Sequence, residues 1–375
     1  MFAYLDNSAT TRPCPEAVAA MVEALETGWG NPSSLYRFGM DAAHRLKAAR
    51  DQVAKALGAE PDRVFFTSGG TEADNWAIFS AMSRMGKRGR HVITTAVEHH
   101  AVLNPMRRLE EQGFEVTYLK PDALGRVCLD ALREAIRPDT VLVSVMMVNN
   151  ESGAVMPIGA MAKLTHRLAP NAIFHTDAVQ GFLKLPFQAK TLGADLISIS
   201  SHKVHGPKGA GALYIRRGLP LPPYLLGGGQ EGGYRSGTEA TPAVAGFGAA
   251  CAAAQPTLRE DLAREVALRD RCAALLAEIP GVELLGAREA PHILLASIPG
   301  VPTQNTINML QDHGVCVSAG SACARGHRSH VLEAMGLPPE TVDGAFRISL
   351  SRFTSPEELE QLAVGLTAVV QRMRR

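Results

Sequence analysis

Seven short apolar segments alternate with stretches of helical pattern between residues 62 and 215, and this alternation constrains the fold more than any other feature. We predict strands at residues 64–67, 91–95, 115–119, 141–148, 172–175, 195–200 and 212–215. Helices fit between most of these strands, as in folds whose mainly parallel sheet is covered on both faces. The sequence therefore predicts an α/β protein.

Two further regions flank this core. Helical patterns cover residues 16–27 and 39–57 before it and residues 257–279 after it, and a last helix starts at Ser355 with Glu358 placed for a capping box. Short strands are expected near residues 293–297, 315–317 and 346–351. We predict a large domain of residues 13–250 and a small α+β domain of residues 1–12 and 251–375.

The bulk composition excludes several classes of protein. The 375 residues carry a formal net charge of +1, which gives no electrostatic reason to expect direct binding to nucleic acid or membrane. No apolar run approaches the roughly 20 residues of a membrane helix, and the start lacks the pattern of a signal peptide. Six cysteines without CxxC pairs predict a reducing compartment, so we expect a cytoplasmic protein.

Lys203 is the first candidate for chemistry. It lies in a Ser-Ser-His-Lys stretch between two predicted strands, next to a glycine-rich turn. A desolvated ammonium tends to lose its proton, and a neutral amine can form a Schiff base with a carbonyl such as that of pyridoxal. A solvated lysine in a turn fits this stretch equally well, so the other strand ends must decide.

Polar residues at four other predicted strand ends favour a cofactor. Gly70 and Thr71 open a helix whose free N–H groups suit a phosphate, although an ordinary capped helix fits them too. Asp177 is either a partner for a protonated pyridine nitrogen or a helix N-cap. His99 can stack on a ring or be structural, and the amide of Asn150 needs a hydrogen-bond partner. Together with Lys203, they describe a pyridoxal phosphate site.

Ten motifs stand in order along nearly the whole chain: YLDNSATT at 4–11, GNPSS at 30–34, TSGGTEADN at 67–75, EH at 98–99, VNNE at 148–151, DAVQ at 177–180, SSHK at 200–203, RSGT at 235–238, SAGSAC at 318–323 and RISLSR at 347–352. Together they resemble the NifS-like cysteine desulfurases, which are class V aminotransferase-like enzymes. The resemblance implies the aminotransferase-like fold type I, with a large domain around a mostly parallel sheet and a smaller α+β C-terminal domain.

The resemblance also implies a role for each matched residue. Lys203 is then the Schiff-base lysine, Asp177 faces the pyridine nitrogen, Gln180 faces the ring hydroxyl, and His99 is catalytic and stacks on the ring. Asn150 contacts cofactor and substrate, and with Arg347 it binds the substrate carboxylate. The phosphate ligands are Gly70, Thr71, Ser200 and His202, joined by Thr238 of a second subunit, which implies an obligate homodimer.

Cys323 distinguishes a desulfurase from an aminotransferase. It lies in a stretch of small residues from 318 to 326, where Arg325 and His327 would favour its thiolate. Such a thiolate can attack the sulfur of pyridoxal-bound L-cysteine, leaving alanine and a persulfide. The simpler reading is a free thiol in a loop. The resemblance implies transfer of the sulfur to an acceptor protein, either an iron–sulfur scaffold or a tRNA-thiolation enzyme, and Cys316 is the one candidate for a resolving cysteine.

Some features depart from the family pattern. Gly232 stands where relatives usually carry a basic residue, and the stretch that follows Cys323 is shorter. The chain ends at Arg375 without the tail by which housekeeping relatives dock a scaffold, so the acceptor stays open, as does the choice between cysteine and selenocysteine.

Three other functions remain open on the sequence alone. One is another pyridoxal phosphate activity, such as an aminotransferase or selenocysteine lyase, although Cys323 argues against plain transamination. Another is a sulfur-relay scaffold with weak catalysis, against which the complete cofactor set argues. The third is a metal site, for which the candidate ligands are Cys323, His327 and His330, or His202 and His205.

Overall fold

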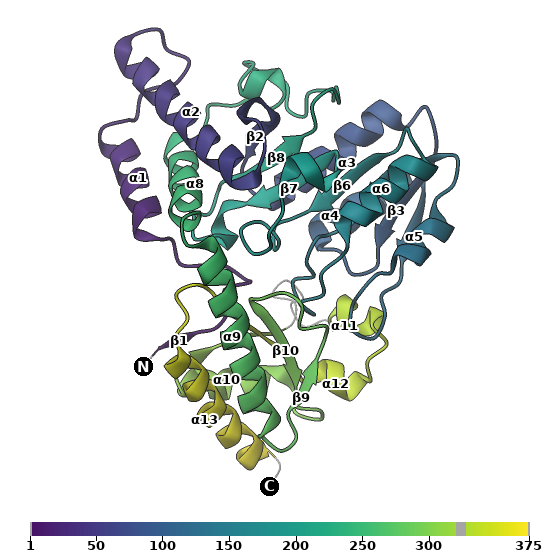
Figure 1. Cartoon of the computed structure of the whole chain (residues 1–375), viewed down its shortest axis with the longest axis vertical. Helices are drawn as coiled ribbons and strands as arrows, with labels where there is room; N and C mark the ends of the chain where they lie inside the picture. The colour runs from purple at the N-terminus through teal and green to yellow at the C-terminus, as the bar shows by residue number, and fades with distance from the viewer. Residues whose placement is uncertain (1, 320–327, 374–375) are drawn as a thin grey trace.

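The computed structural model describes residues 2–319 and 328–373, which form a large seven-stranded sheet and a smaller C-terminal sheet (Figure 1). The large sheet has the order β2-β8-β7-β6-β5-β3-β4, in which β8 is antiparallel to both neighbours and the other pairs are parallel. Its strands are β2 (Val64–Thr67), β3 (His91–Thr95), β4 (Glu115–Leu119), β5 (Thr140–Ser144), β6 (Ile173–Asp177), β7 (Leu196–Ser200) and β8 (Gly211–Ile215). The predicted α/β architecture is confirmed.

Helices cover the large sheet on both faces because successive residues of its strands point in opposite directions. On β6, Ile173 packs into the cluster that contains α3 and α4, whereas Phe174 packs into the cluster that contains α6. The helices of this region are α3 (Gly70–Met85), α4 (His100–Glu111), α5 (Leu129–Ala135), α6 (Ile158–Leu168) and α7 (Ala189–Leu192). His175 and Asp177 share the face of Ile173, so they lie on the α3 side of the sheet.

One predicted strand was too long. The apolar run at residues 141–148 predicted a single strand, but β5 ends at Ser144. The next residues follow β6 for a short distance, since Met147 N–H donates to the carbonyl of Asp177 over 2.8 Å, and Val148 then bridges to Val155. An apolar run indicates that residues are buried, not that they form a strand, and here the residues stay buried after the chain has left the sheet.

The C-terminal region builds its own sheet, in the order β12-β13-β10-β9. These strands are β12 (Ser318–Ala319), β13 (Ala345–Ser349), β10 (Ile293–Ser297) and β9 (Glu283–Leu285). The first residues of the chain lie beside this region, because β1 (Ala3–Tyr4) pairs in parallel with β11 (Val315–Cys316). The helices here are α9 (Leu258–Ala277), α10 (Thr303–Asp312), α11 (His330–Ala334), α12 (Pro339–Asp343) and α13 (Pro356–Met373).

Three helices form a layer at the other end of the molecule (Figure 1). In this layer α1 (Pro15–Glu26) and α2 (Arg37–Leu57) both pack on α8 (Thr241–Ala254), and the predicted domain boundary at residue 250 lies within α8. At the far end of the chain, the predicted capping contact before α13 is present, since Ser355 N–H donates to Glu358 Oε2 over 2.7 Å. The other oxygen of Glu358 accepts from Tyr4 N–H, which fastens the N-terminal strand to α13.

Candidate active site

The predicted site residues of the large sheet lie at one edge of it. Parallel strands bring their carboxyl ends to the same edge, which is where open α/β sheets bind ligands. Asp177 ends β6, Ser200 ends β7, and Lys203 ends the short 3₁₀ turn that follows β7. His99 precedes α4, which follows β3, and Gly70 opens α3 after β2. The fold therefore brings together residues that are far apart in sequence.

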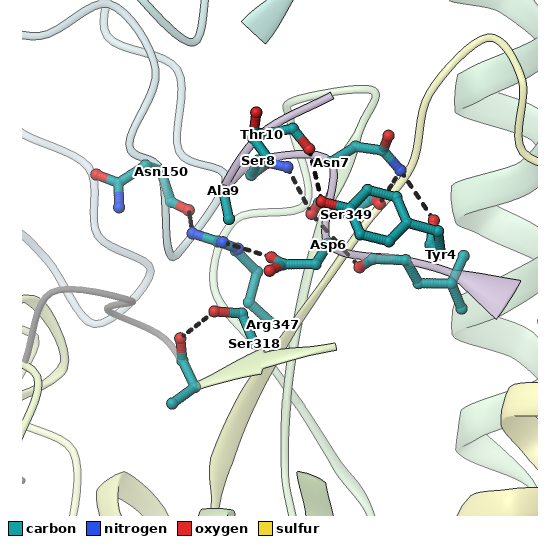
Figure 2. Close-up of polar contacts among 12 residues, drawn as sticks. Tyr4, Asp6, Asn7, Ser8, Ala9, Thr10, Asn150, Ser318, Arg347 and Ser349 are labelled. Atoms are coloured by element: carbon teal, nitrogen blue, oxygen red, sulfur yellow. Dashed lines mark hydrogen bonds and ion pairs between the residues drawn. The ribbon is translucent and has the colours of Figure 1, made fainter. Parts of the chain in front are cut away.

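The amine of Lys203 is held by the N-terminal segment. Its Nζ donates to the main-chain carbonyl of Ser8 over 2.5 Å and to that of Ala9 over 2.8 Å. The segment is itself fixed on the small sheet, because Ser8 N–H donates to Ser349 Oγ over 2.8 Å (Figure 2). The sequence did not predict this role, because the acceptors are main-chain carbonyls, which every residue type has.

The N-terminus of α3 and the end of β7 make a cradle that fits a phosphate. A Cβ added at Gly70 would lie 2.6 Å from Val179 Cγ2 and 3.7 Å from the Cβ of Ser200, so the backbone here passes close to Val179, just after β6, and lies in contact range of the end of β7. Ser200 Oγ is buried and has no hydrogen-bond partner in the described part of the chain. An unsatisfied buried hydroxyl beside the free N–H groups of a helix start suits an anion.

The other predicted phosphate ligands differ in exposure and in their contacts. Thr71 is exposed on the first turn of α3, and His202 Nδ1 lies 3.2 Å from Thr10 Oγ1. Burial, together with the charge of Lys203, lowers the pKa of His202 to about 4, so its ring is neutral near pH 7. Thr238 is also exposed, in a segment that the Arg235–Glu72 ion pair (2.7 Å) fastens to α3.

Asp177 and His99 have the properties that a pyridine ring requires. Asp177 Oδ1 accepts from Val179 N–H over 2.9 Å, and burial raises the pKa of this carboxyl to about 6. No helix begins at Asp177, so the alternative of an N-cap fails. His99 caps α4 by accepting from Ala101 N–H at Nδ1 over 3.0 Å, and burial followed by the charge of Lys203 lowers its pKa to about 4. A neutral ring of this kind can stack on an aromatic cofactor.

Gln180 is fixed by two contacts that the sequence did not indicate. Its Nε2 donates to the carbonyl of Ser8 over 2.9 Å, and its Oε1 lies 3.1 Å from Nε2 of the buried His292. His292 precedes β10, so the Gln180 amide links the large sheet to the small one. The predicted contact with a ring hydroxyl stays a prediction.

Arg347 of β13 lies buried between the N-terminal segment and the loop after β5 (Figure 2). Its Nη1 donates to the main-chain carbonyl of Asn150 over 2.8 Å, and its Nη2 lies 3.0 Å from Asp6 Oδ1. The side-chain amide of Asn150 points away from Arg347 in Figure 2. A guanidinium fixed in this way can present its fork to a carboxylate, but its contact with the substrate stays a prediction.

Cys323 lies outside the described residues, as do Arg325 and His327. The chain before them runs beside Arg347, because Ser318 of β12 pairs with that residue. The chain after them contacts the loops that follow β5 and β3, since Ser329 Oγ donates to Glu151 Oε2 over 2.5 Å and His330 Nε2 lies 3.0 Å from the carbonyl of Glu98.

Two features are absent from the described residues. No three His, Cys, Asp or Glu side chains among residues 2–319 and 328–373 come together as metal ligands would. None of the helices in these ranges is both long enough and apolar enough to cross a bilayer.

Comparison with known proteins gives the family. Residues 3–362 match the family "Aminotransferase class-V", so the chain belongs to it. The chain is 42% identical to "Cysteine desulfurase IscS" of Methanosarcina thermophila over 99% of its own length and 92% of that protein's. It is equally identical to the protein of the same name from Vibrio atlanticus, with 99% and 93% covered.

Solved structures agree with this assignment. A "NIFS-LIKE PROTEIN" superposes with a TM-score of 0.94 at 36% identity, covering 99% of this chain and all of the other. A NifS-like protein from Rickettsia africae gives a TM-score of 0.87 at 31% identity, again over 99% and 100%. The resemblance seen in the sequence and the fold type I architecture are confirmed. The class V family depends on pyridoxal phosphate, and the residues described above fit this cofactor.

Proposed function

We propose that this chain is a cysteine desulfurase, which converts L-cysteine to L-alanine and keeps the sulfur as a persulfide on Cys323. The observation that carries the proposal is the 42% identity to proteins named cysteine desulfurase over 99% of the chain. Cys323, which follows β12 in the sequence, is the thiol that the reaction requires. The net change balances: L-cysteine and the Cys323 thiol give L-alanine and the Cys323 persulfide.

Pyridoxal phosphate, when bound, supplies a carbonyl for an amine and an electron sink for the substrate. The protein supplies position and protons. Lys203 provides the amine, and the carbonyls of Ser8 and Ala9 direct it toward the N-terminal segment. Asp177 holds the ring nitrogen by charge, and Ser200, with the start of α3, holds the phosphate.

His99 is placed to move a proton, and Arg347 is placed to bind the substrate carboxylate. Because His99 Nδ1 accepts a main-chain N–H, the proton of its neutral ring is on Nε2, which is the atom able to hold or pass a proton. Arg347 orients the substrate carboxylate, with Asn150 beside it. The Cys323 thiolate would then attack the substrate sulfur, forming an S–S bond as the C–S bond of the substrate breaks; the bonding pair leaves with the substrate carbon, which takes up a proton to give alanine. Cys316 is a poor candidate for a second thiolate, since burial raises its pKa.

The working form is proposed to be a homodimer in which Thr238 completes the phosphate site of the other subunit. Large apolar side chains exposed on α1, on α2 and on the segment between them support this, because monomers rarely leave such patches uncovered. These side chains are Val18, Val22, Leu25, Trp29, Leu35, Tyr36 and Met40. Thr238 is exposed and thus accessible to a second copy.

The wider setting is part of the same proposal. The sulfur acceptor is a protein, either an iron–sulfur cluster scaffold or a tRNA-thiolation enzyme, and the enzyme is cytoplasmic. The division into residues 13–250 and residues 1–12 with 251–375 is supported by the two sheets and by the pairing of β1 with β11. The competing functions are another class V activity, either transamination or selenocysteine lysis, and a sulfur-relay subunit of weak activity.

Replacing the cysteine tests the proposal. Cys323→Ser should keep the bound cofactor but lose alanine formation from L-cysteine. Cys128→Ser is the matched control, because Cys128 is exposed and its N-cap contact to Ala131 N–H can be made by serine as well. Alanine formation that persists in Cys323→Ser would remove the desulfurase assignment and favour another class V activity.

A further inference from the structure

A layer of buried ionisable groups lies directly beneath Asp177, on the α3 side of the sheet. His175 precedes Asp177 by two residues on β6 and shares its face, Asp74 comes from α3, and Glu98 comes from the loop after β3. Asp74 is 1% exposed, and His175 and Glu98 are fully buried. Nothing in the proposed reaction uses these three side chains directly.

His175 does not supply a positive charge to this layer. Its Nδ1 lies 2.8 Å from Ser144 Oγ and its Nε2 lies 2.9 Å from Ser198 Oγ, so serine hydroxyls on the neighbouring strands satisfy both nitrogens. Asp74 Oδ1 is 3.5 Å from Nε2, which is too long for a good hydrogen bond. Burial lowers the pKa of His175 to about 3, so the ring is neutral.

Both additional carboxyl groups have an oxygen that nothing satisfies. Glu98 Oε1 accepts from Thr95 Oγ1 and from Met146 N–H, each over 2.8 Å. Glu98 Oε2 and Asp74 Oδ1 are buried and have no hydrogen-bond partner among the residues that the structure describes. A buried ionised carboxylate needs a cation or several donors, whereas a neutral carboxylic acid is far less costly to bury.

Among the described residues, few positively charged groups lie near the three carboxyl groups of Asp177, Asp74 and Glu98. Lys203 is the cation whose charge acts on Asp177, and its Nζ also serves the carbonyls of Ser8 and Ala9. His99 is neutral near pH 7, and His330 Nε2 lies against the main-chain carbonyl of Glu98, with the ring of His100 beside it. Three negative charges would therefore lie close together in a site that excludes water.

We propose that Asp74 and Glu98 are held as neutral carboxylic acids, so that Asp177 alone carries the negative charge of this layer toward the cofactor ring. Both are positioning residues, because they act through Asp177. If either ionised, its repulsion would make Asp177 harder to ionise and would weaken its attraction for a ring cation. This inference rests on the role of Asp177 in the proposed function.

Infrared difference spectroscopy of the holoenzyme tests the protonation state directly. Glu98→Gln and Asp74→Asn keep the shape of each side chain, and the spectrum of each variant is subtracted from that of the wild type at about pH 6.5. We expect each difference spectrum to show the carbonyl band of a protonated carboxylic acid, which the wild type has and the variant lacks. Glu134→Gln, at an exposed position of α5, is the control, and its difference spectrum should show a carboxylate band instead.

Two outcomes overturn the proposal: loss of a carboxylate band in Glu98→Gln, or the same loss in Asp74→Asn. If a variant does not fold, wild-type holoenzyme is labelled with ¹³C at the Asp carboxyls and, in a second sample, at the Glu carboxyls, and absence of any protonated carboxyl signal at about pH 6.5 from either label overturns the proposal for that residue. Neither readout depends on persulfide formation, so failure of the desulfurase assignment and failure of this inference are separately visible.

Discussion

Arg347 and Glu98 are both buried charged residue types at the same site, and the protein treats them in opposite ways. Arg347, from the small sheet, is 2% exposed and has Asp6 and the carbonyl of Asn150 within hydrogen-bond distance. Glu98, from the large sheet, leaves one buried oxygen unsatisfied. The two proposals above account for the difference: charge is retained at Arg347, the proposed partner of the substrate carboxylate, and suppressed at Glu98, where it would compete with Asp177.

Lys203→Ala should have the largest effect, because it removes both the proposed reactive amine and the cation that acts on Asp177. We expect alanine formation to fall below detection and the yellow absorbance of the lysine–cofactor linkage to disappear. Absorption spectra of the purified variant with added pyridoxal phosphate measure this. A variant that stays yellow after gel filtration would show that another lysine holds the cofactor.

Arg347→Met tests how much the buried contacts of Arg347 with Asp6 and the Asn150 carbonyl contribute to stability. It leaves Asp6 and the Asn150 carbonyl without their buried partner, so the free energy of unfolding should fall by about 3–5 kcal/mol. The KM for L-cysteine should rise as well. Urea unfolding and steady-state kinetics measure the two effects.

Arg328→Met is the matched control, because the Arg328–Asp343 pair (2.7 Å) is exposed and such pairs contribute little. Equal losses of stability in the Arg347 and Arg328 variants would mean that burial of the Arg347 pair does not matter.

Two buried glutamates sharpen the comparison further. Glu231 accepts from both terminal nitrogens of Arg50, at 2.6 and 2.7 Å, and from Phe66 N–H, whereas Glu98 has no cationic partner among the described residues. Glu231→Gln should lower the free energy of unfolding by about 3 kcal/mol near pH 7, because it leaves Arg50 uncompensated.

Glu98→Gln should behave differently, and its effect should depend on pH. Burial raises the pKa of Glu98 from 4.5 to about 8 in the folded protein. Its contribution to stability is therefore fully present below pH 4.5 and is lost as the pH rises to about 8. Glutamine does not titrate, so the melting temperature of Glu98→Gln relative to the wild type should rise between about pH 5 and pH 8. A constant difference would contradict the neutral state of Glu98.

Much of the fold could be predicted because its signals are local. The apolar runs at β2, β3, β4 and β10 gave their bounds as the structure has them. Lys203 and Asp177 could be singled out as candidates because each lies at the end of a predicted buried strand, where a polar group is costly to bury without a partner, whereas Ser200 was named only from the resemblance.

The interactions that assemble the site were not predictable in the same way. The carbonyls of Ser8 and Ala9 reach Lys203 across 195 and 194 residues, and they are main-chain groups that any residue would provide. The contact between His292 and Gln180 likewise depends on how the small sheet packs on the large one. The proposed neutral state of Glu98 depends on the lack of a cation or further hydrogen-bond donors near its carboxyl among the described residues, and the sequence around Glu98 does not predict this.

The most direct test of the account is mass spectrometry of the purified holoenzyme after brief incubation with L-cysteine, with alanine measured in parallel. The account predicts a gain of one sulfur atom that maps to Cys323, together with released alanine. Bound pyridoxal phosphate with alanine but no sulfur on Cys323, or with no alanine at all, would contradict it.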